Sequence, residues 1–312
     1  MNIHMDFNIE AYLDSLPEDI EKINIRNRNL TYIPSLERFK KLKILYCNIN
    51  KLTSLPPLNE KLERLYCGYN QLTSLPPLNE NLQKLHCGNN RLTSLPSLNE
   101  KLETLFCDNN ELTFLPSLNK NLKELYSEHN QLTSLPELNK NLQELYCEDN
   151  QLTFLPELNK NLQELYCENN QLTSLPYLNE NLQQLYCNDN QLTFLPHLNE
   201  NLQRLFCSNN QLTYLPSLNE NLQELSCDGN LINEIIKGNV LRDKKKQIQI
   251  INNFRYLYYS LKFKKRFLHL LWLKIREPKI RKKYHPSNLM ENIEKDSDFI
   301  LKMVYEPDAI FG

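Results

Sequence analysis

The most regular feature of the chain is a leucine that returns every twenty residues, at positions 42, 62, 82, 102, 122, 142, 162, 182, 202 and 222. Each begins the pattern L-x-x-L-x-C-x-x-N-x-L-T-x-L-P-x-L-N-x-x, in which apolar and polar positions keep a fixed order. A degenerate and slightly longer repeat begins at Ile20, and the last repeat loses the pattern after Ile235. A constant period of this length indicates stacked repeats, which here number eleven across residues 20–236.

Within one repeat, the spacing of the apolar residues predicts a short strand and an extended return. Leu142, Leu145 and Cys147 alternate with polar residues, as one face of a strand requires. Stacking then pairs the strands of successive repeats into a parallel sheet. Asn150 follows at the turn, where its side chain can satisfy backbone groups, and its copies can form a ladder. Pro156 and its equivalents favour an extended return segment over a helix.

This pattern resembles the leucine-rich repeat, whose signature places Leu, Asn and Cys at the same offsets. The short period followed by "LTSLP" or "LTFLP" resembles the LPX-type repeat of bacterial effector proteins. Combined with a composition typical of an AT-rich genome, it also resembles the repeat proteins of giant DNA viruses of amoebae. We therefore predict an α/β repeat solenoid: a leucine-rich-repeat horseshoe with a parallel concave β-sheet, extended convex arcs and an α-helical C-terminal region. This scaffold binds many unrelated partners, so the fold alone does not define the function.

The two ends of such an array need cover, because a stack of strands leaves open edges. Residues 1–19, with "AYLDSL" as a short helix, are expected to form an N-terminal cap. Residues 237–312 are expected to form a basic helical cap or tail. Residues 244–277 lack Gly and Pro, which predicts one or two helices that end at Pro278. A further short helix is expected in "SNLMENIEKDSDFILKMVY".

Charge separates the array from the C-terminal region, although the formal net charge of the whole chain is only −2. Residues 42–236 carry 12 basic and 23 acidic residues, a net charge of −11, whereas residues 237–312 carry 18 and 8, a net charge of +10. Within the latter, residues 237–283 hold 16 basic and 2 acidic residues. This segment could cap the array, bind an anionic membrane surface or nucleic acid, or be attracted to the acidic array itself.

Strand alternation also identifies the positions that point outward from the predicted sheet. The column that contains Tyr146 carries a ring in nine consecutive repeats, from Tyr46 to Phe206. The columns on either side carry glutamate in the middle repeats. The expected partner-binding residues are therefore Tyr126, Tyr146, Tyr166, Tyr186, Phe106, Phe206, Glu124, Glu144, Glu164, Glu128, Glu148 and Glu168.

Two interpretations of these columns stay open. The rings could stack on one another and simply cover the sheet, with the acids solvated. Alternatively, they form a docking face, since tyrosine is enriched in binding hot spots and adjacent like charges favour a cationic partner. The second interpretation predicts a protein partner rich in Lys or Arg, and it disfavours nucleic acid at this face.

All nine cysteines share one inward position of the repeat: 47, 67, 87, 107, 147, 167, 187, 207 and 227, with Ser127 in the remaining place. Free cysteine behaves as a small buried hydrophobe, so we expect core packing. Disulfides, a zinc site and a catalytic thiol are disfavoured by the parallel side chains, the lack of a C-x-x-C pair and the acidic neighbours. Cys147-Glu148-Asp149 and Cys187-Asn188-Asp189 match the Cys-x-Asp motif of ubiquitin-ligase domains that accompany some LPX repeats, yet both lie inside repeats.

The sequence as a whole predicts a non-enzymatic protein–protein interaction module without catalytic residues, metal or cofactor. Its alternatives are a protein associated with ubiquitin ligation, or a tether to membrane or nucleic acid through residues 237–283. No secretory signal and no apolar stretch of membrane-spanning length is visible, so an intracellular, cytoplasmic protein is expected. The pattern leaves the oligomeric state and the identity of the partner open.

Overall fold

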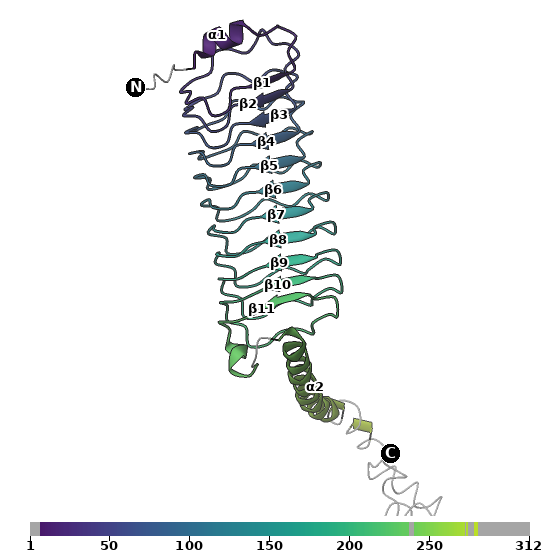
Figure 1. Ribbon diagram of the computed structural model, residues 1–312. Helices are drawn as coiled ribbons and strands as arrows, with labels where there is room; N and C mark the ends of the chain where they lie inside the picture. The colour runs from purple at the N-terminus through teal and green to yellow at the C-terminus, as the bar shows by residue number, and fades with distance from the viewer. Residues whose placement is uncertain (1–6, 237–239, 272, 274–277, 280–312) are drawn as a thin grey trace, which may run out of the picture. The chain divides into compact units, whose positions relative to one another are not determined.

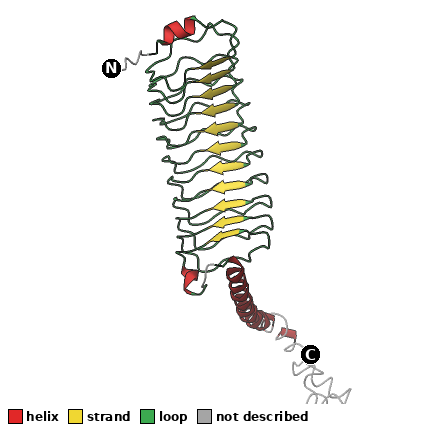
Figure 2. Cartoon of the chain, viewed as in Figure 1, coloured by secondary structure: helices red, strands yellow, loops and turns green. Residues whose placement is uncertain are grey.

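The computed structural model describes residues 7–236, 240–271, 273, 278 and 279. The chain divides into two compact parts, Met1–Gln249 and Ile250–Gly312. The first part contains the repeat array, in which each repeat contributes one strand of three residues (Figures 1 and 2). The strands are β1 (Lys22–Asn24), β2 (Ile44–Tyr46), β3 (Arg64–Tyr66), β4 (Lys84–His86), β5 (Thr104–Phe106), β6 (Glu124–Tyr126), β7 (Glu144–Tyr146), β8 (Glu164–Tyr166), β9 (Gln184–Tyr186), β10 (Arg204–Phe206) and β11 (Glu224–Ser226).

All eleven strands form one parallel sheet in the order of the sequence, which confirms the predicted solenoid. The twenty-residue period sets the register directly, so that Leu145 pairs with Leu165 and Tyr146 with Tyr166. The middle residue is buried in β1–β10 and partly exposed in β11, and in the central strands its two neighbours are partly exposed. We call the outward side of the strands the sheet face. The segments that lead from each strand back to the next are the return segments.

The core is a set of leucine columns closed by the cysteine column. Leu142, Leu145, Cys147 and Leu152 have 0% of their surface exposed, and Leu155 has 7%. The parallel cysteine side chains also donate to the next repeat, as Cys147 Sγ does to the Tyr166 carbonyl at 3.3 Å. All nine cysteines are free and buried, which confirms the prediction of core packing. Each buried leucine contributes about 1.5–3 kcal/mol only when the neighbouring repeat is present, so stability belongs to the stack.

An asparagine ladder fixes the turn after each strand. Asn150 Oδ1 accepts from the Leu132 amide at 2.9 Å, and its Nδ2 donates to the Ser127, Cys147 and Glu148 carbonyls at 3.0–3.2 Å. One side chain thus bonds two successive repeats, as the sequence predicted. Two further amide columns at the other end of the repeat were not expected: Asn179 Nδ2 donates to the Asn159 carbonyl at 2.9 Å, and Asn181 Nδ2 to the Lys160 carbonyl at 2.8 Å.

The residue before each ladder asparagine lies in the left-handed region of backbone conformation. Most repeats place Asn, Asp or His there, such as Asp149 with φ 51° and Asn169 with φ 51°. These side chains tolerate that conformation better than other residues do. Ile49 and Tyr69 are exceptions, with φ of 59° and 56°. A β-branched or bulky side chain in this region stores local strain, and both cases fall in the first three strand-bearing repeats.

The N-terminal helix lies against the start of the array. α1 (Ile9–Asp14) is capped by Asn8, whose side chain accepts from the Ala11 amide, and it buries Ile9 and Leu13. The short helix predicted within residues 1–19 is therefore present, although it begins before "AYLDSL". The Arg38 guanidinium forms an ion pair with Asp14 at 3.0 Å.

After the last strand, the chain forms a short 3-10 helix, η1 (Leu231–Glu234), and then α2 (Leu241–Leu271). The first turns of α2 lie over the last repeat: Ile248 is buried, and Lys245 Nζ donates to the Glu220 and Leu222 carbonyls at 3.1 and 2.9 Å. Lys244 is 5% exposed and pairs with Asp228 at 3.5 Å. Lys244 thus pairs with a carboxylate and Lys245 with open backbone carbonyl groups of the last repeat, whereas a purely passive cap would leave both lysines solvated.

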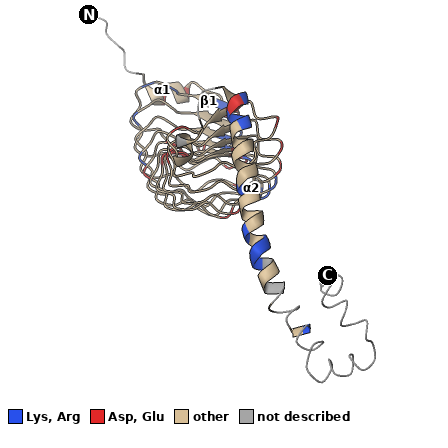
Figure 3. Cartoon of the chain, turned by 90° about the horizontal axis from the view of Figure 1, so that it is seen from below, with Lys and Arg blue, Asp and Glu red and all other residues tan. Residues whose placement is uncertain are grey.

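Lys and Arg recur along the rest of α2 (Figure 3). Its hydrophobic side chains are also exposed, including Phe254, Tyr256 and Leu257. The structure describes α2 as far as Leu271, and residues 272 and 274–277, through which the predicted helix would continue to Pro278, lie outside the described residues. No described helix is long and apolar enough to span a bilayer. The further helix expected in residues 287–305 lies outside the described residues.

Candidate functional site

The ring column of the sheet face is one continuous stack. Neighbouring ring centroids lie 4.0–4.6 Å apart through all nine repeats, and most pairs are within 19° of parallel. This is the close contact that in-register parallel strands impose on identical side chains. The faces of the inner rings are therefore covered by their neighbours. What the stack presents to solvent is a row of ring edges and, in the tyrosine repeats, hydroxyl groups.

The glutamate column on one side of the rings is bonded to the tyrosine hydroxyls. Tyr126 donates to Glu144 at 2.6 Å and Tyr146 to Glu164 at 2.8 Å, each reaching from its own strand to the next. Tyr166 continues the series by donating to Gln184 at 3.1 Å. Burial together with these carboxylate neighbours raises the pKa of Tyr126 and Tyr146, so the phenols stay protonated and act as donors.

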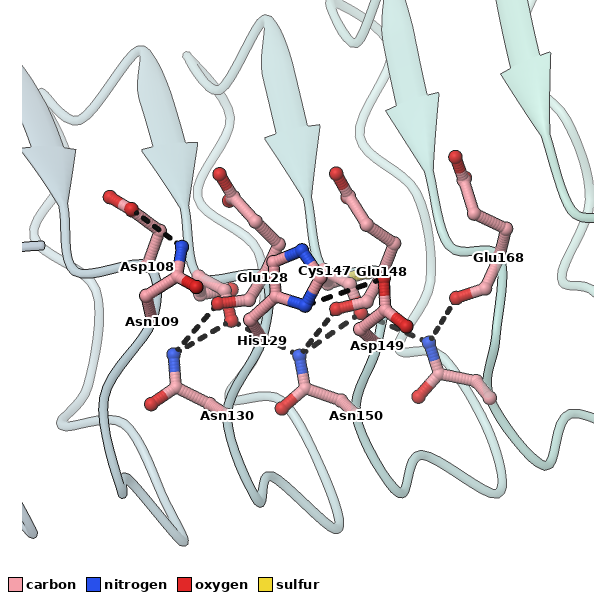
Figure 4. Close-up of polar contacts among 12 residues, drawn as sticks. Asp108, Asn109, Glu128, His129, Asn130, Cys147, Glu148, Asp149, Asn150 and Glu168 are labelled. Carbon is pink, nitrogen blue, oxygen red and sulfur yellow. Dashed lines mark hydrogen bonds and ion pairs between the residues drawn. The ribbon is translucent and has the colours of Figure 1, made fainter. Parts of the chain in front are cut away.

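The glutamate column on the other side, formed by Glu128, Glu148 and Glu168, is partly desolvated. The three side chains lie side by side (Figure 4), and each keeps one carboxyl oxygen buried without a hydrogen-bond partner. Burial, reinforced by neighbouring acids, raises the pKa of Glu128 to about 7 and that of Glu148 to about 8. The pKa of Glu168 is raised for the same leading reason. This row, which we call the glutamate row, therefore holds protons near neutral pH and is less negative than its composition suggests.

Nearer the N-terminus, the same column carries Gly68 and Gly88 instead of an acid. The missing side chains leave a hollow of about 280 Å³, lined by Asn48, Tyr66, Tyr69, His86, Phe106 and Asp108. Asn48 Oδ1 is buried there without a hydrogen-bond partner, and the Asp108 carboxylate folds over Gly88, where a Cβ would lie only 2.1 Å from Oδ1. Burial, aided by Lys84, lowers the pKa of His86 to about 4, so its ring is neutral in the stack.

The two Cys-x-Asp sequences do not form a reactive centre in this geometry. Cys147 and Cys187 are 0% exposed. Burial, reinforced by Glu148 for Cys147 and by Cys167 for Cys187, raises both thiol pKa values well above the ordinary range. A buried, protonated thiol lacks the access and the thiolate that nucleophilic catalysis needs. Within the described part of the chain, no three His, Cys, Asp or Glu side chains are grouped to hold a metal ion.

The structure places all the predicted partner-binding residues on one surface. The six aromatic and three of the acidic residues lie in β5–β10, and Glu128, Glu148 and Glu168 follow two residues after their strands. Sequence reasoning missed the hollow, since Gly68 and Gly88 were visible only as gaps in an acidic column. It also missed Tyr69, which is 62% exposed at a strained position beside the hollow.

Comparison with known proteins agrees with the architecture. The sequence family described as "Leucine Rich repeats (2 copies)" matches residues 60–100, 140–180 and 160–200. The structure of YopM from Yersinia enterocolitica WA-314 is similar, with a TM-score of 0.62 and 33% identity over 69% of this chain and 52% of that one. This chain thus spans about half the length of that structure. YopM from Yersinia pestis, described as a leucine-rich effector protein, has a TM-score of 0.53 and 28% identity, over 67% of this chain and 78% of that one.

A structure of the Toll–Spatzle complex from Drosophila shares the fold, with a TM-score of 0.54 at 21% identity over 68% of this chain and 35% of that one. No curated protein sequence matches the chain. The repeat signature, the sheet and these similarities identify a leucine-rich-repeat protein. Proteins of this kind are typically non-enzymatic scaffolds, which suggests a module for protein–protein interaction.

Proposed function

We propose that the chain is a non-enzymatic interaction module whose sheet face binds a basic segment of another protein. The observation that carries this proposal is the unbroken ring stack of β2–β10 with acidic side chains along both sides of its middle. The binding residues would be Tyr126, Tyr146, Tyr166, Tyr186, Phe106, Phe206, Glu124, Glu144, Glu164, Glu128, Glu148 and Glu168. We further propose that the repeats are of the LPX type, that they resemble those of giant viruses, and that the protein works inside a cell.

The stacking of the rings limits how a partner can bind. Because both faces of each inner ring are covered, a guanidinium group cannot stack on Tyr146 or Tyr166. At the N-terminal end of the stack, Lys22 already lies over Tyr46, 5.0 Å from the ring centroid. A partner therefore meets ring edges, hydroxyl groups and carboxylates. The rings are also held in place before binding, which reduces the entropy cost of ordering them.

The glutamate row couples binding to protons. A Lys or Arg near Glu148 favours the charged carboxylate, so binding would release the proton that burial retains. Affinity for a basic partner should therefore be greater at pH 8 than at pH 6. An ordinary acidic surface with unshifted carboxyl groups would show little change over this range.

Titration calorimetry with an octalysine peptide tests the proposal. Replacing Glu124, Glu144 and Glu164 by Gln should weaken binding about tenfold or more, because three charges facing the peptide are lost. The matched control replaces Glu111, Glu137 and Glu157 by Gln, which removes the same charge from the exposed return segments. Equal weakening by both triple variants would show nonspecific attraction to an acidic protein and would refute the docking face.

A tether through residues 237–283 is a second candidate function, favoured by the exposed rings of Phe254 and Tyr256 among the basic residues of α2. A basic helix with exposed aromatic side chains can lie on an anionic membrane. Sedimentation of the full chain with phosphatidylserine vesicles tests this, and a DNA duplex in place of vesicles tests nucleic acid. Variants Phe254→Ala and Tyr256→Ala should lose vesicle binding. If they retain it, α2 is not the tether.

A further inference from the structure

The return segments carry an alternating column of phenylalanine and serine. Phe114, Phe154 and Phe194 stand at the same position in every second repeat, and Ser134 and Ser174 occupy that position between them. We call these five residues the phenylalanine column. The three rings are 55%, 55% and 43% exposed, and both serines are exposed as well. The three rings therefore recur at a fixed spacing on one exposed surface of the return segments.

The spacing of the column leaves room for one ring between each pair of phenylalanines. Strands of neighbouring repeats lie ~4.8 Å apart, so rings two repeats apart are separated by about 10 Å. In the stack on the sheet face, contacting rings lie 4.0–4.6 Å from each other. A ring inserted above Ser134 would therefore have Phe114 and Phe154 at about stacking distance on its two sides. The small serine side chain leaves the floor of this gap open.

Most of the surface that precedes the column is uncharged. Thr133, Thr153 and Thr173 are exposed immediately before the column positions. Gln131, Gln151, Gln171, Gln191 and Gln211 form the next exposed column of the same segments, in which Glu111 beside Phe114 is the one charged residue along the phenylalanine column. The repeats carry a strong negative charge elsewhere, which would repel another copy of the chain. This mostly uncharged strip is a place where two acidic molecules can approach.

We propose that the phenylalanine column is a self-association surface, on which a second copy of this chain docks with its rings in the serine gaps. The occupant is a second copy because the projecting rings and the gaps that fit them have the same period and belong to the same column. A two-fold axis perpendicular to the column brings the rings of one copy over the serines of the other, and the contact closes as a dimer. This surface lies on the return segments, so the proposal does not depend on the function proposed for the sheet face.

Sedimentation equilibrium of the full chain over a range of concentrations tests the proposal. The wild-type protein, with a monomer mass of 37.1 kDa, should sediment as a dimer. Phe154→Ser should raise the dissociation constant at least about tenfold, because the two-fold axis removes two buried rings with one substitution. Serine is the natural residue at this position in the neighbouring repeats, so the fold should tolerate it, which circular dichroism checks.

The double variant Ser134→Phe and Ser174→Phe distinguishes specific insertion of rings into the serine gaps, which we call the zipper, from nonspecific hydrophobic association. It fills the gaps with rings, so a specific zipper should dissociate, whereas nonspecific hydrophobic association should become stronger. Phe254→Ser is the matched control on α2 and should leave the dissociation constant unchanged. A monomeric wild type, tighter association of the double variant or an unchanged dissociation constant for Phe154→Ser would each overturn the proposal.

Discussion

Two sections of the sheet face share one backbone and differ in chemistry. The glycine section, around Gly68 and Gly88, has a hollow, a neutral His86 and the basic side chains of Arg64 and Lys84. The glutamate section, which comprises the glutamate row and β6–β8, has identical neighbours stacked in register. Leucine, cysteine and asparagine positions are the same in both, except that Ser127 replaces one cysteine in the glutamate section. The scaffold is therefore set by the inward columns, while a few outward columns decide what each section can bind.

The difference also shows what repetition does to an ionisable group. Glu148 lies between Glu128 and Glu168, whose charges add to the effect of burial and raise its pKa. In the glycine section the neighbours differ from one another, so Asp108 can fold over Gly88 and accept from Asn89 Nδ2 at 3.0 Å. Identical neighbours thus raise a carboxyl pKa, whereas dissimilar ones provide hydrogen bonds.

The strongest test of a shared scaffold is loss of the ladder asparagine in each section. Asn90→Ala and Asn150→Ala should each reduce the free energy of unfolding by roughly 2–4 kcal/mol, since several buried backbone groups lose their partner. Asn90 makes the same set of bonds as Asn150, to the Leu72 amide and the Cys67, Cys87 and Gly88 carbonyls. Urea denaturation measures both, with exposed Gln151→Ala as a control near zero. A cost for Asn90→Ala less than half that for Asn150→Ala would show that the sections are built differently.

The glutamate row should make the protein less stable as pH rises. A carboxyl group whose pKa is raised by folding contributes stability that is present below its unfolded pKa of about 4.3 and is lost as pH passes the folded value. For Glu148 that value is about 8. After allowance for its solvent-exposed part, the expected loss between pH 5 and pH 8 is about 1–2 kcal/mol. Glu148→Gln should remove its own share of the slope in denaturation at the two pH values and leave the shares of Glu128 and Glu168, whereas exposed Glu137→Gln should leave the whole slope. A slope unchanged in Glu148→Gln would contradict the assignment.

The glycine section should show the opposite dependence on pH. Folding lowers the pKa of His86, so its stability contribution is present above the unfolded value of about 6.5 and is lost as pH falls toward about 4. Because this side chain is partly exposed, the loss should be about 1 kcal/mol. His86→Phe supplies the ring that Phe106 provides one repeat later and should abolish the loss in thermal unfolding at pH 4 and pH 7. The exposed His197→Asn serves as the control, and an equal effect there would remove His86 as the cause.

The smallest expected difference concerns the tyrosine hydroxyls. Tyr146→Phe should cost about 0.5–1 kcal/mol, since it removes the hydrogen bond to Glu164 and leaves the ring stack intact. Tyr66→Phe in the glycine section should cost close to nothing, because its hydroxyl makes no hydrogen bond to any residue that the structure describes. Denaturation of the two variants side by side measures the difference. Equal costs would mean that the bond to Glu164 contributes no stability.

Most of the array could be predicted from the sequence, because its determinants are local and repeated. The strand around Leu145, the turn at Asn150 and the burial of Cys147 all follow from residues within one repeat. The site was harder, because its properties arise between repeats. Tyr146 reaches Glu164 of the next strand, and the proton on Glu148 depends on the burial of the whole row. The alternation of Phe154 and Ser174 was visible in the sequence, but its exposure required the folded return segment.

Ends and interruptions were the least predictable parts. Lys245 could be identified as basic, but its bonds to the Glu220 and Leu222 carbonyls depend on where α2 meets the last repeat. In the sequence, Gly68 shows only that this repeat lacks the acidic side chain of its column. The hollow depends on how Tyr66, Tyr69 and Asp108 are arranged around it in the structure. A feature that occurs in only one repeat is not part of the repeated pattern, so the pattern cannot predict it.

The phenylalanine column has a consequence for how such a protein can change in length. The hydrogen bonds of the ladder join neighbouring repeats, as Asn150 joins its repeat to Ser127 and Leu132, so loss or duplication of a single repeat preserves the scaffold. The alternation of rings and serines has a period of two repeats. An odd change within the column would place two rings or two serines next to each other, and only even changes keep the alternation. Recombination among the repeats can therefore conserve the fold while it switches self-association off or on.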